Sequence, residues 1–589
     1  MPLDYGALDR GRGVNYWEYD PVLRREVRRT LPEADREWAE ARLSSFGETV
    51  GTTIAENADV VDEHPPELDT YDREGEVVNR VTYHPAHLEN ERLTYEAGGV
   101  ADAFRAPPGR DEPVSLTHNL AAGYLLGMVD IGLACPFAMT AGAALVLEAF
   151  SEHDEPFRAL TARDYDDLAT GAMFLTEIQG GSDVGATETT AEHVEDDVYR
   201  LEGEKWFTSN IDAGVVLALA RRPDAPEGTA GLSLFVVPST KRDGEPNDYY
   251  FRRLKDKLGT KSVPTGEVEL RGAEGYLVGE PERGFKYMAE MLNMERLHNA
   301  VGSVGSMRRA LLESTVKAAD REAFGSTLDE KPLMRRDLVD MAVDHEAATA
   351  FTFDAVRAFD RYHRGEDRPG VDPDEAYRLL RMLVPIAKHR TGRMAVDATS
   401  YAIEIQGGNG YTEEWVTERL LRDAQVLPVW EGTSNVLSLD VLRAMAKEGA
   451  HVAVLERIRA YLDETEHHAP LASDAAAVRD EVEELEDALT ALGTADREYA
   501  ELNAKALADY VFDVYAGALL LAQAARDLAA DDPDARKAVV ARRWIDRHLR
   551  DRPARGITSD DRLPVEQYDA VVRFAPVDPE ALAEPRAAD

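Results

Sequence analysis

The sequence predicts a multidomain protein with a helical N-terminal domain, a middle β domain, a C-terminal helical bundle and an appended helical domain. Three observations predict this order. Helix-like spacing of apolar residues dominates residues 1–170, short β-favouring runs fill residues 171–284, and long helical patterns return over residues 285–447. Residues 448–589 are rich in Ala, Glu and Asp and again show helical spacing. A chain of 589 residues exceeds the size at which one hydrophobic core stops growing, so several packed domains are expected.

Two regions of the N-terminal domain differ from the rest. A polar, Pro-containing segment at residues 59–75 is expected to interrupt the helices. Residues 120–150 are apolar enough to raise the question of a membrane span, but Asp130, the Cys135–Pro136 step and many small residues divide the stretch into two shorter pieces. We therefore expect buried helices and no membrane association.

Changes in residue composition and in the spacing of apolar residues predict the later domains. In the bundle, an acidic insert at residues 365–374 separates two long helical patterns. In the appended domain, helical spacing covers residues 478–492 and 500–528, and residues 558–589 are expected to be loosely ordered. The strands of the middle domain are predicted from the runs GAMFLTEI, VYRLEGEKWFTS, GVVLALA, LSLFVVP and GEVELRG.

The charge balance is strongly acidic. With 111 acidic and 67 basic residues, the formal net charge is -44. Such a surface repels DNA phosphates and anionic membranes, and it matches the solvated carboxylate surface of proteins in concentrated salt. We interpret the chain as a halophilic, cytoplasmic protein, because its N-terminus also lacks the basic start and apolar run of a secretory signal. The single cysteine, Cys135, supports neither an internal disulfide nor a zinc centre, so no metal is predicted.

A hydroxyl-rich turn with two glycines, LTEIQGGSDV at residues 175–184, follows a predicted strand. Adjacent glycines let backbone NH groups approach a ligand closely, and Thr176 and Ser182 add donors suited to a flavin edge or a pyrophosphate. The segment GEKWFTSN at residues 203–210 places aromatic rings and hydroxyls on a strand, where they could wall a planar ring system. Taken alone, the first segment is more often a simple connection, and the second is also compatible with core packing.

A third cluster lies in the helical bundle. QGGNGY at residues 406–411 ends one helical pattern, and VWEGTSN at residues 429–435 follows another. Glu431, beside Trp430 and before a glycine, could lie in an apolar pocket that makes its carboxylate a stronger base, as proton abstraction requires. A lone glutamate would usually be solvated surface instead.

In combination, these segments resemble the acyl-CoA dehydrogenase superfamily over residues 100–445. LTEIQGGSDV, GEKWFTSN, KLGTKSVPTGEVEL, DREAFG, IQGGNGY and VWEGTSN occur in the order and approximate spacing of that family. The resemblance is closest to the AidB (adaptive-response) subgroup, which shares the CP-x-x-MT element at residues 135–140 and an added C-terminal helical domain. It implies an acyl-CoA dehydrogenase-like fold with a C-terminal four-helix bundle, FAD between the β domain and the bundle, and a homotetramer.

The resemblance also implies roles for individual residues. Glu431 would take the α-proton of an acyl-CoA substrate as a hydride moves from the β-carbon to the flavin, which gives a trans-2-enoyl-CoA. Arg321 and Phe324 of DREAFG resemble the pair that reaches the FAD of a neighbouring subunit, and Gly407 and Gly408 lie at the adenine-side turn. The other residues implied to contact FAD are Thr176, Ser182, Phe207, Ser209, Thr433 and Asn435.

Two carboxylates compete for the role of the base. Glu295 resembles the position from which isovaleryl-CoA and long-chain acyl-CoA dehydrogenases supply theirs. We favour Glu431, because it lies in the position that most of the family uses and its WEG context is intact. The alternative interpretation of Glu295 is a helix-surface contact with His298, three residues further on.

The sequence departs from the family pattern at two positions. Arg296 resembles a residue that approaches CoA, whereas the acidic companion of that residue is replaced by Asn293. Glu404 stands where many members have Gln, so no FAD contact is assigned to it.

Two rival functions stay open. An acyl-CoA oxidase shares the fold and an appended domain, and no residue decides oxygen access or the electron acceptor. A DNA-protecting flavoprotein needs a positive surface, and residues 536–555 form a locally basic, amphipathic helix opposed only by Asp546 and Asp551. We favour an intersubunit ion-pair surface against the acidic body, with at most weak DNA binding. The basic residues are Arg536, Lys537, Arg542, Arg543, Arg547, Arg550, Arg552 and Arg555.

Overall fold

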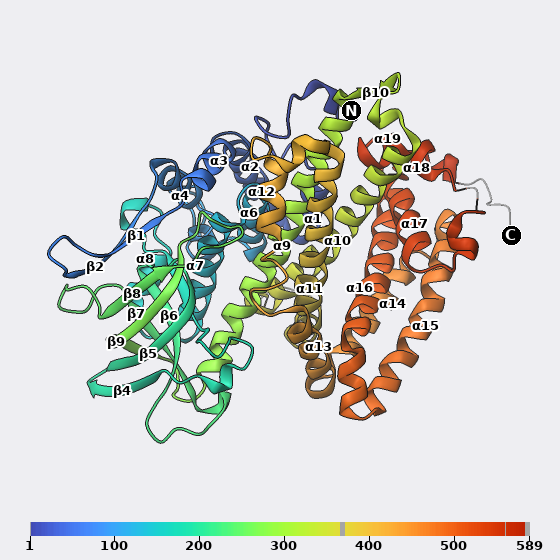
Figure 1. Ribbon diagram of the computed structural model, residues 1–589. Helices are drawn as coiled ribbons and strands as arrows, with labels where there is room; N and C mark the ends of the chain where they lie inside the picture. The colour runs from blue at the N-terminus through green and yellow to red at the C-terminus, as the bar shows by residue number, and fades with distance from the viewer. Residues whose placement is uncertain (1, 366–370, 560, 583–589) are drawn as a thin grey trace. The chain divides into compact units, whose positions relative to one another are not determined.

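The computed structural model shows long helices and one multistranded sheet (Figure 1). It describes residues 2–365, 371–559 and 561–582. The predicted order of a helical region, a β region, a bundle of long helices and further appended helices is confirmed.

Two compact units make up the chain. Residues 32–302 form the first, which we name the sheet unit; residues 1–31 and 303–589 form the second, which we name the bundle unit. The short N-terminal helix α1 (Pro21–Thr30) packs on α10 (Pro332–Arg364), so it belongs to the bundle unit although the helices that follow it belong to the sheet unit.

The helices of the sheet unit come before its main strands. The interruption predicted at residues 59–75 is present: a helix ends at Glu63, and the antiparallel hairpin of β1 (Glu67–Tyr71) and β2 (Val77–Thr82) follows it. The helices are α2 (Glu33–Thr49), α3 (Ala55–Glu63), α4 (Pro85–Glu96), α5 (Ala101–Phe104), α6 (Leu116–Gly127), α7 (Ile131–Phe150) and α8 (Asp154–Leu160).

The apolar stretch at residues 120–150 is divided once, by Asp130. Its carboxylate accepts a hydrogen bond from the backbone N of Leu133 at 3.1 Å and so caps the start of α7. The predicted second break is wrong, because α7 continues through Pro136. By length and composition, α7 and α16 (Arg497–Leu528) could span a membrane, but 72% and 78% of their most apolar windows are buried within the fold, as in core helices.

Five of the seven strands of the main sheet, β3, β5, β6, β7 and β9, coincide with the predicted β-favouring runs, and β4 and β8 were not predicted. β6 pairs with β4 on one side and β7 on the other, and β4, β5, β9 and β7 pair in succession, so these five strands close on themselves. The first six residues of β6 and of β7 are buried, which explains their continuous apolar sequences. The strands are β3 (Gly171–Phe174), β4 (Thr190–Glu195), β5 (Val198–Ser209), β6 (Val215–Arg221), β7 (Leu232–Pro238), β8 (Tyr249–Leu254) and β9 (Thr265–Val278).

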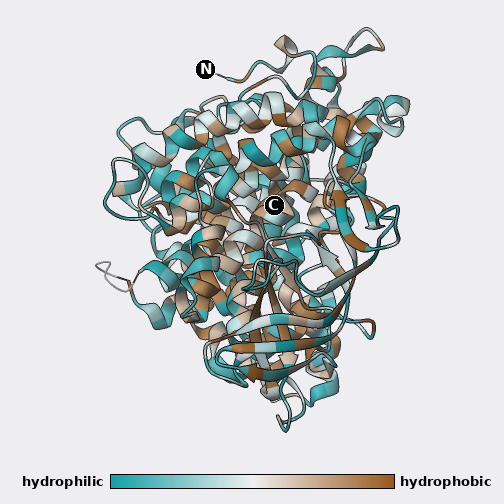
Figure 2. Ribbon diagram, turned by 90° about the vertical axis from the view of Figure 1, so that its left-hand side faces the viewer, coloured by the Kyte–Doolittle hydropathy of each residue, from teal (hydrophilic) through white to brown (hydrophobic). Residues whose placement is uncertain are grey.

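The bundle unit is built on helices of more than thirty residues. α10 packs along α11 (Pro373–Gln406), and α12 (Val416–Ala424) and α13 (Ser434–Glu448) pack on α11. α9 (Gly284–Asp320) begins in the sheet unit and continues into the bundle unit. Many helices in Figure 2 carry hydrophobic and hydrophilic residues on the same ribbon, as amphipathic helices with one buried face do.

The predicted acidic insert at residues 365–374 lies partly outside the described residues. Its last part is described, and Asp372 caps the start of α11, where its carboxylate accepts a hydrogen bond from the backbone N of Asp374 at 2.9 Å.

The appended helices pack on the bundle within the same unit. α16 lies against α10 and α13, and also against α14 (Ala450–Asp463), α15 (Ala472–Thr494) and α17 (Arg536–His548). The predicted helices at residues 478–492 and 500–528 are therefore confirmed.

The C-terminal segment is more ordered than its sequence predicts. The prediction of a loosely ordered stretch at residues 558–589 is wrong for α18 (Leu563–Glu566) and α19 (Tyr568–Val572), because Tyr568 and Val571 are buried. Residues 560 and 583–589 lie outside the described part.

Candidate functional site

The turn after β3 is anchored by a buried carboxylate. Glu177 accepts hydrogen bonds from Lys205 Nζ at 2.8 Å, from Thr189 Oγ1 at 2.5 Å and from the backbone N of Glu188 at 2.7 Å. Lys205 is fully buried on β5 and also donates to the carbonyl of Leu219 at 3.3 Å. One ion pair therefore ties the turn to the sheet beneath it.

Pairing with a cation and hydrogen bonding together change the pKa of Glu177 more than burial does. Burial alone would raise the pKa of its carboxyl, but the Lys205 ammonium and several hydrogen bonds lower that pKa to about 2. Burial lowers the pKa of Lys205 itself, and Glu177 opposes this shift. Because the folded pKa of Glu177 is depressed, its stabilising contribution is present above the ordinary glutamate pKa and is lost as the pH falls towards about 2.

We expect Glu177→Gln to destabilise the protein most at neutral pH. The shift of the Glu177 pKa from 4.5 to about 2 corresponds to a free energy of unfolding on the order of 3 kcal/mol. Denaturation midpoints of wild type and variant should therefore differ at pH 7 and converge as the pH falls from 4.5 towards 2. A difference that stays constant over this range would contradict the assignment.

The glycine turn leaves its polar groups accessible. A Cβ on Gly181 would come within 2.4 Å of Thr176 Oγ1, so only glycine allows the turn to close onto that hydroxyl. The backbone carbonyl of Thr176 accepts a hydrogen bond from the backbone N of Trp206 at 2.9 Å. Ser182 is exposed on the outer side of the turn. The structure thus brings Thr176 and the aromatic segment of β5 together, as the sequence predicts.

The aromatic segment of β5 carries an exposed ring. Phe207 is 56% exposed, an unusual fraction for phenylalanine on a central strand. Lys255 Nζ lies 3.4 Å from the ring centroid of Trp206 and 4.8 Å from that of Phe207, and it donates to Glu267 Oε1 at 2.6 Å. The two rings are held in place by this cation and remain available to a planar ligand.

Ser209, at the end of β5, is half-buried. Its Oγ lies 3.0 Å from Thr265 Oγ1 on the neighbouring strand β9, and either hydroxyl can donate. The side chain is therefore fixed beside the aromatic segment.

Glu295 and Arg296 lie on the first half of α9, in the sheet unit. Glu295 and Asn293 are buried and Arg296 is half-buried. The alternative interpretation of Glu295 as a surface partner of His298 is wrong, since both side chains are buried and His298 Nε2 instead lies 2.8 Å from Asn119 Oδ1. The burial of Glu295 is compatible with the alternative assignment of this residue as the base.

Glu431 lies in a strained turn of the bundle unit. Its φ is 54°, in the left-handed region that non-glycine residues rarely adopt, and Gly432 follows with φ 105°. Lys388, fully buried on α11, donates from Nζ to the carbonyl of Gly432 at 2.6 Å. Such a backbone conformation persists only where surrounding contacts impose it, and the Lys388 bond is one of them.

The turn around Glu431 offers further polar groups. Glu431 is half-buried, while Thr433 and Asn435 at the start of α13 are exposed. Among the described residues, the buried Nε1 of Trp430 has no hydrogen-bond partner. A buried indole NH without a partner indicates that a ligand or water completes this part of the site.

The GGNGY turn and the DREAFG segment meet within the bundle unit. Arg321 Nη1 lies 3.3 Å from the position that a Cβ on Gly407 would take. Gly408 is exposed and has open space at its Cα. Phe324, at the tip of the β10 (Glu322–Ala323) and β11 (Ser326–Thr327) hairpin, has φ 55° and is 97% exposed. Arg321 and Gly407 therefore lie together, and Gly408 and Phe324 are both accessible.

Glu404 lies near this surface but has a different role. Its backbone carbonyl accepts a hydrogen bond from the backbone N of Gly407, which ends α11, and its side chain is exposed.

The basic segment at residues 536–555 is not one free helix. α17 ends at His548, so the predicted helix is too long. Its cations pair within the chain: Arg536 with Glu346, Arg543 with Asp340 and Asp561, and Arg547 with Asp344. Arg542 and Arg550 both pair with Asp474. The acidic partners predicted on another subunit are thus found within the same chain for these residues.

The sequence did not reveal the roles of three lysines, two in the sheet unit and one in the bundle unit, that support the predicted segments. Lys205, Lys255 and Lys388 each contact a segment that the sequence singled out. Lys388 follows the apolar run MLVPIA. A single lysine after such a run is the one sequence signal for its role, because a buried charge needs a specific partner.

Four known families match successive parts of the chain. The Adaptive response protein AidB N-terminal domain matches residues 9–167, and the acyl-CoA dehydrogenase middle and C-terminal domains match residues 172–273 and 282–446. The Acyl-CoA dehydrogenase 11 C-terminal domain-like family matches residues 452–566.

Individual relatives extend over most of the chain. Acyl-CoA dehydrogenase family member 11 of Caenorhabditis elegans is 34% identical over 536 residues, which cover 88% of this chain and 86% of that protein. The putative acyl-CoA dehydrogenase AidB of Escherichia coli is 36% identical and covers 70% of this chain and 75% of its own. The crystal structure of C. elegans ACDH-11 in complex with C11-CoA superposes with a TM-score of 0.84 at 32% identity, over 94% of each chain.

Proposed function

The chain belongs to the acyl-CoA dehydrogenase family of FAD-dependent oxidoreductases, and we propose that it oxidises an acyl-CoA thioester to a trans-2-enoyl-CoA with Glu431 as the base. The observation that carries the proposal is the Glu431 turn, with its left-handed backbone and its buried Lys388 contact. Backbone strain of this kind is typical of residues held in place for chemistry.

The residues present fit FAD. An isoalloxazine ring needs an aromatic wall and hydrogen-bond donors, and Phe207 offers an exposed ring beside the hydroxyls of Thr176 and Ser209. The exposed hydroxyl of Ser182 suits a pyrophosphate, and the polar groups of Thr433 and Asn435 are accessible on the bundle unit. When bound, FAD supplies the acceptor for the hydride.

The side chains of the chain itself would perform the proton transfer. The α-proton of a thioester becomes acidic only when its carbonyl oxygen receives hydrogen bonds, and the backbone NH of Glu431 is the donor that the protein provides. The Glu431 carboxylate then takes the proton from the α-carbon. A fixed turn serves both tasks, because one residue supplies donor and base in a set geometry.

The substrate is proposed to be a CoA ester. ACDH-11, the relative with 94% coverage, was crystallised with C11-CoA. Arg296, half-buried on α9, is proposed to approach the CoA moiety.

A homotetramer is proposed from the Phe324 hairpin. A phenylalanine that is 97% exposed at a hairpin tip costs hydration free energy in a monomer and is expected to be covered in an assembly. Arg321, Gly407 and Gly408 lie on the same unit, and we propose that this surface contacts the FAD of a neighbouring subunit.

Anaerobic titration tests the proposed activity. The purified protein is expected to carry close to one noncovalent FAD per chain, and one compound of an acyl-CoA panel should bleach the flavin absorbance. A protein without flavin bands after reconstitution with FAD would contradict the cofactor site. Bound FAD that no acyl-CoA reduces would contradict the activity alone, and fast reoxidation by air with peroxide release would identify an oxidase.

A DNA-protecting role is not favoured by the charges of the described residues. Counterion release drives DNA binding and needs cations available to phosphates, but five arginines of the basic segment already form ion pairs within the chain. We propose instead a cytoplasmic, halophilic metabolic enzyme, in keeping with the net charge of -44.

A further inference from the structure

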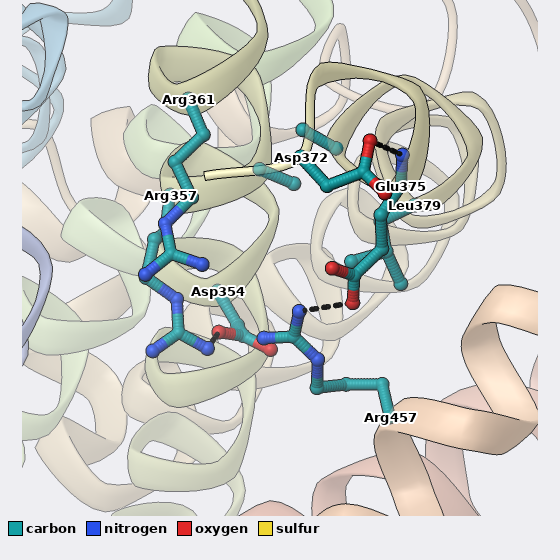
Figure 3. Close-up of a pocket in the computed structure, with 9 residues that line it drawn as sticks. Asp354, Arg357, Arg361, Asp372, Glu375, Leu379 and Arg457 are labelled. Carbon is teal, nitrogen blue, oxygen red and sulfur yellow. Dashed lines mark hydrogen bonds and ion pairs between the residues drawn. The ribbon is translucent and has the colours of Figure 1, made fainter. Parts of the chain in front are cut away.

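A pocket in the bundle unit lies away from the residues assigned to catalysis. Residues of α10, of α11 and its N-cap, and of α14 line about 290 Å³ of space that is continuous with solvent. Three arginines, Arg357, Arg361 and Arg457, extend towards it, and their guanidinium groups converge in Figure 3. Part of this space is open solvent, so only a ligand of a few atoms is indicated.

Two of the three arginines are paired. Arg357 contacts the Asp354 carboxylate and donates to Tyr461 Oη at 2.6 Å, and Asp354 also accepts from the hydroxyls of Tyr461 and Tyr515. Arg457 Nη2 donates to Glu375 Oε1 at 2.8 Å. The third carboxylate of the pocket, Asp372, caps α11. Each carboxylate of the pocket therefore already has a partner.

Arg361 differs from both of its neighbours. It is half-buried, and within the described ranges it makes no hydrogen bond or ion pair. It lies one helical turn after Arg357, a spacing at which like charges repel. Burial lowers the pKa of Arg361, and the charges of Arg357 and Arg457 lower it further. Asp354 and Glu375 act on the charge of Arg361 from a distance, but among the described residues neither forms an ion pair with it.

We propose that the pocket binds a small oxyanion, held by Arg361 with the help of Arg457. A planar guanidinium presents two NH donors in the geometry of a carboxylate, phosphate or sulfate group. The anion would give Arg361 a direct partner of the kind that Arg357 and Arg457 already have. Because the lining helices include α14 of the appended domain as well as α10 and α11, an occupied pocket would also strengthen the attachment of that domain to the bundle.

Ligand-dependent stability tests the proposal in the intact protein. Sodium chloride is replaced stepwise by sulfate, phosphate or acetate at constant ionic strength, and the melting temperature is measured for wild type, Arg361→Gln and Arg393→Gln. Arg393 is an exposed arginine of α11 outside the pocket, so its variant is the matched control. The melting temperature of wild type and of Arg393→Gln should rise to a plateau as the oxyanion concentration increases, and that of Arg361→Gln should not. Equal rises in all three proteins would indicate a general salt effect and overturn the site.

Anomalous diffraction locates the ion directly. Crystals soaked in selenate should show a peak between Arg361 and Arg457 in wild type and no peak in Arg361→Gln. A bromide peak at this position without a selenate peak would overturn the oxyanion class, and no peak in either soak would overturn the site. Neither readout depends on flavin or on acyl-CoA turnover, so the outcome is independent of the proposed activity.

Discussion

Replacing Glu431 with Gln is expected to abolish acyl-CoA-dependent flavin reduction while FAD stays bound. Gln preserves the shape of the side chain and the left-handed turn, but its amide cannot accept the α-proton. The loss of a positioned base typically costs about 10²- to 10⁴-fold in rate. Stopped-flow reduction under anaerobic conditions measures this loss, and the flavin absorbance of the same sample shows whether the cofactor is retained.

Glu295→Gln provides the matched comparison. Glu295 is the second buried carboxylate that the family resemblance offers, and its replacement should leave most of the reduction rate intact. If Glu295→Gln is the inactive variant and Glu431→Gln is active, the base must be reassigned to α9. If both variants bleach normally, neither glutamate is the base.

The fold was predictable because its signals are local. The apolar runs of β6 and β7 are buried over their first six residues, so the apolar residues in the sequence coincide with the buried residues in the structure. The break at Asp130 was predicted as well, and its cause is local, because Asp130 caps the helix that begins directly after it. Pro136 was misread, because the surrounding helix tolerates a residue that interrupts most helices.

The sequence singles out the motifs of the candidate site but not the residues that support them. The motifs contain Glu431 and the segments predicted to face the flavin. The left-handed φ of Glu431, however, depends on tertiary contacts such as the bond between Gly432 and Lys388, which lies 44 residues earlier. The same limit applies to α17. Its cations are obvious in the sequence, whereas Asp340 and Asp344 lie 203 residues away from their arginine partners. Local patterns cannot reveal such pairs.

Replacing Glu346 with Gln is expected to cause the largest loss of stability. Glu346 is buried on α10 and accepts two hydrogen bonds from Arg536, at 3.0 and 2.6 Å, and a contact from the buried Lys537. Burial would raise the pKa of Glu346, but the two cations hold it well below its ordinary value. Among the described residues, the amide would leave Lys537 with Glu26 as its remaining carboxylate partner, 3.9 Å from Nζ, and would leave Arg536 without an ion pair. Removing one partner of a buried pair costs about 3–5 kcal/mol, which denaturant unfolding at fixed salt would measure.

An exposed pair on α16 provides the control. Glu501 pairs with Arg497, whose side chain is 91% exposed, so Glu501→Gln should change stability by no more than about 0.5 kcal/mol. The sign of the pH dependence gives a second check. Because the folded pKa of Glu346 is depressed, its contribution is complete above the ordinary glutamate pKa and disappears as the pH falls through the folded value. The difference in the free energy of unfolding between wild type and Glu346→Gln should therefore become smaller at acidic pH. If Glu346→Gln and Glu501→Gln lowered the free energy of unfolding at neutral pH by the same small amount, buried charges would not hold α17 in place. Its arginines would then be available to other partners.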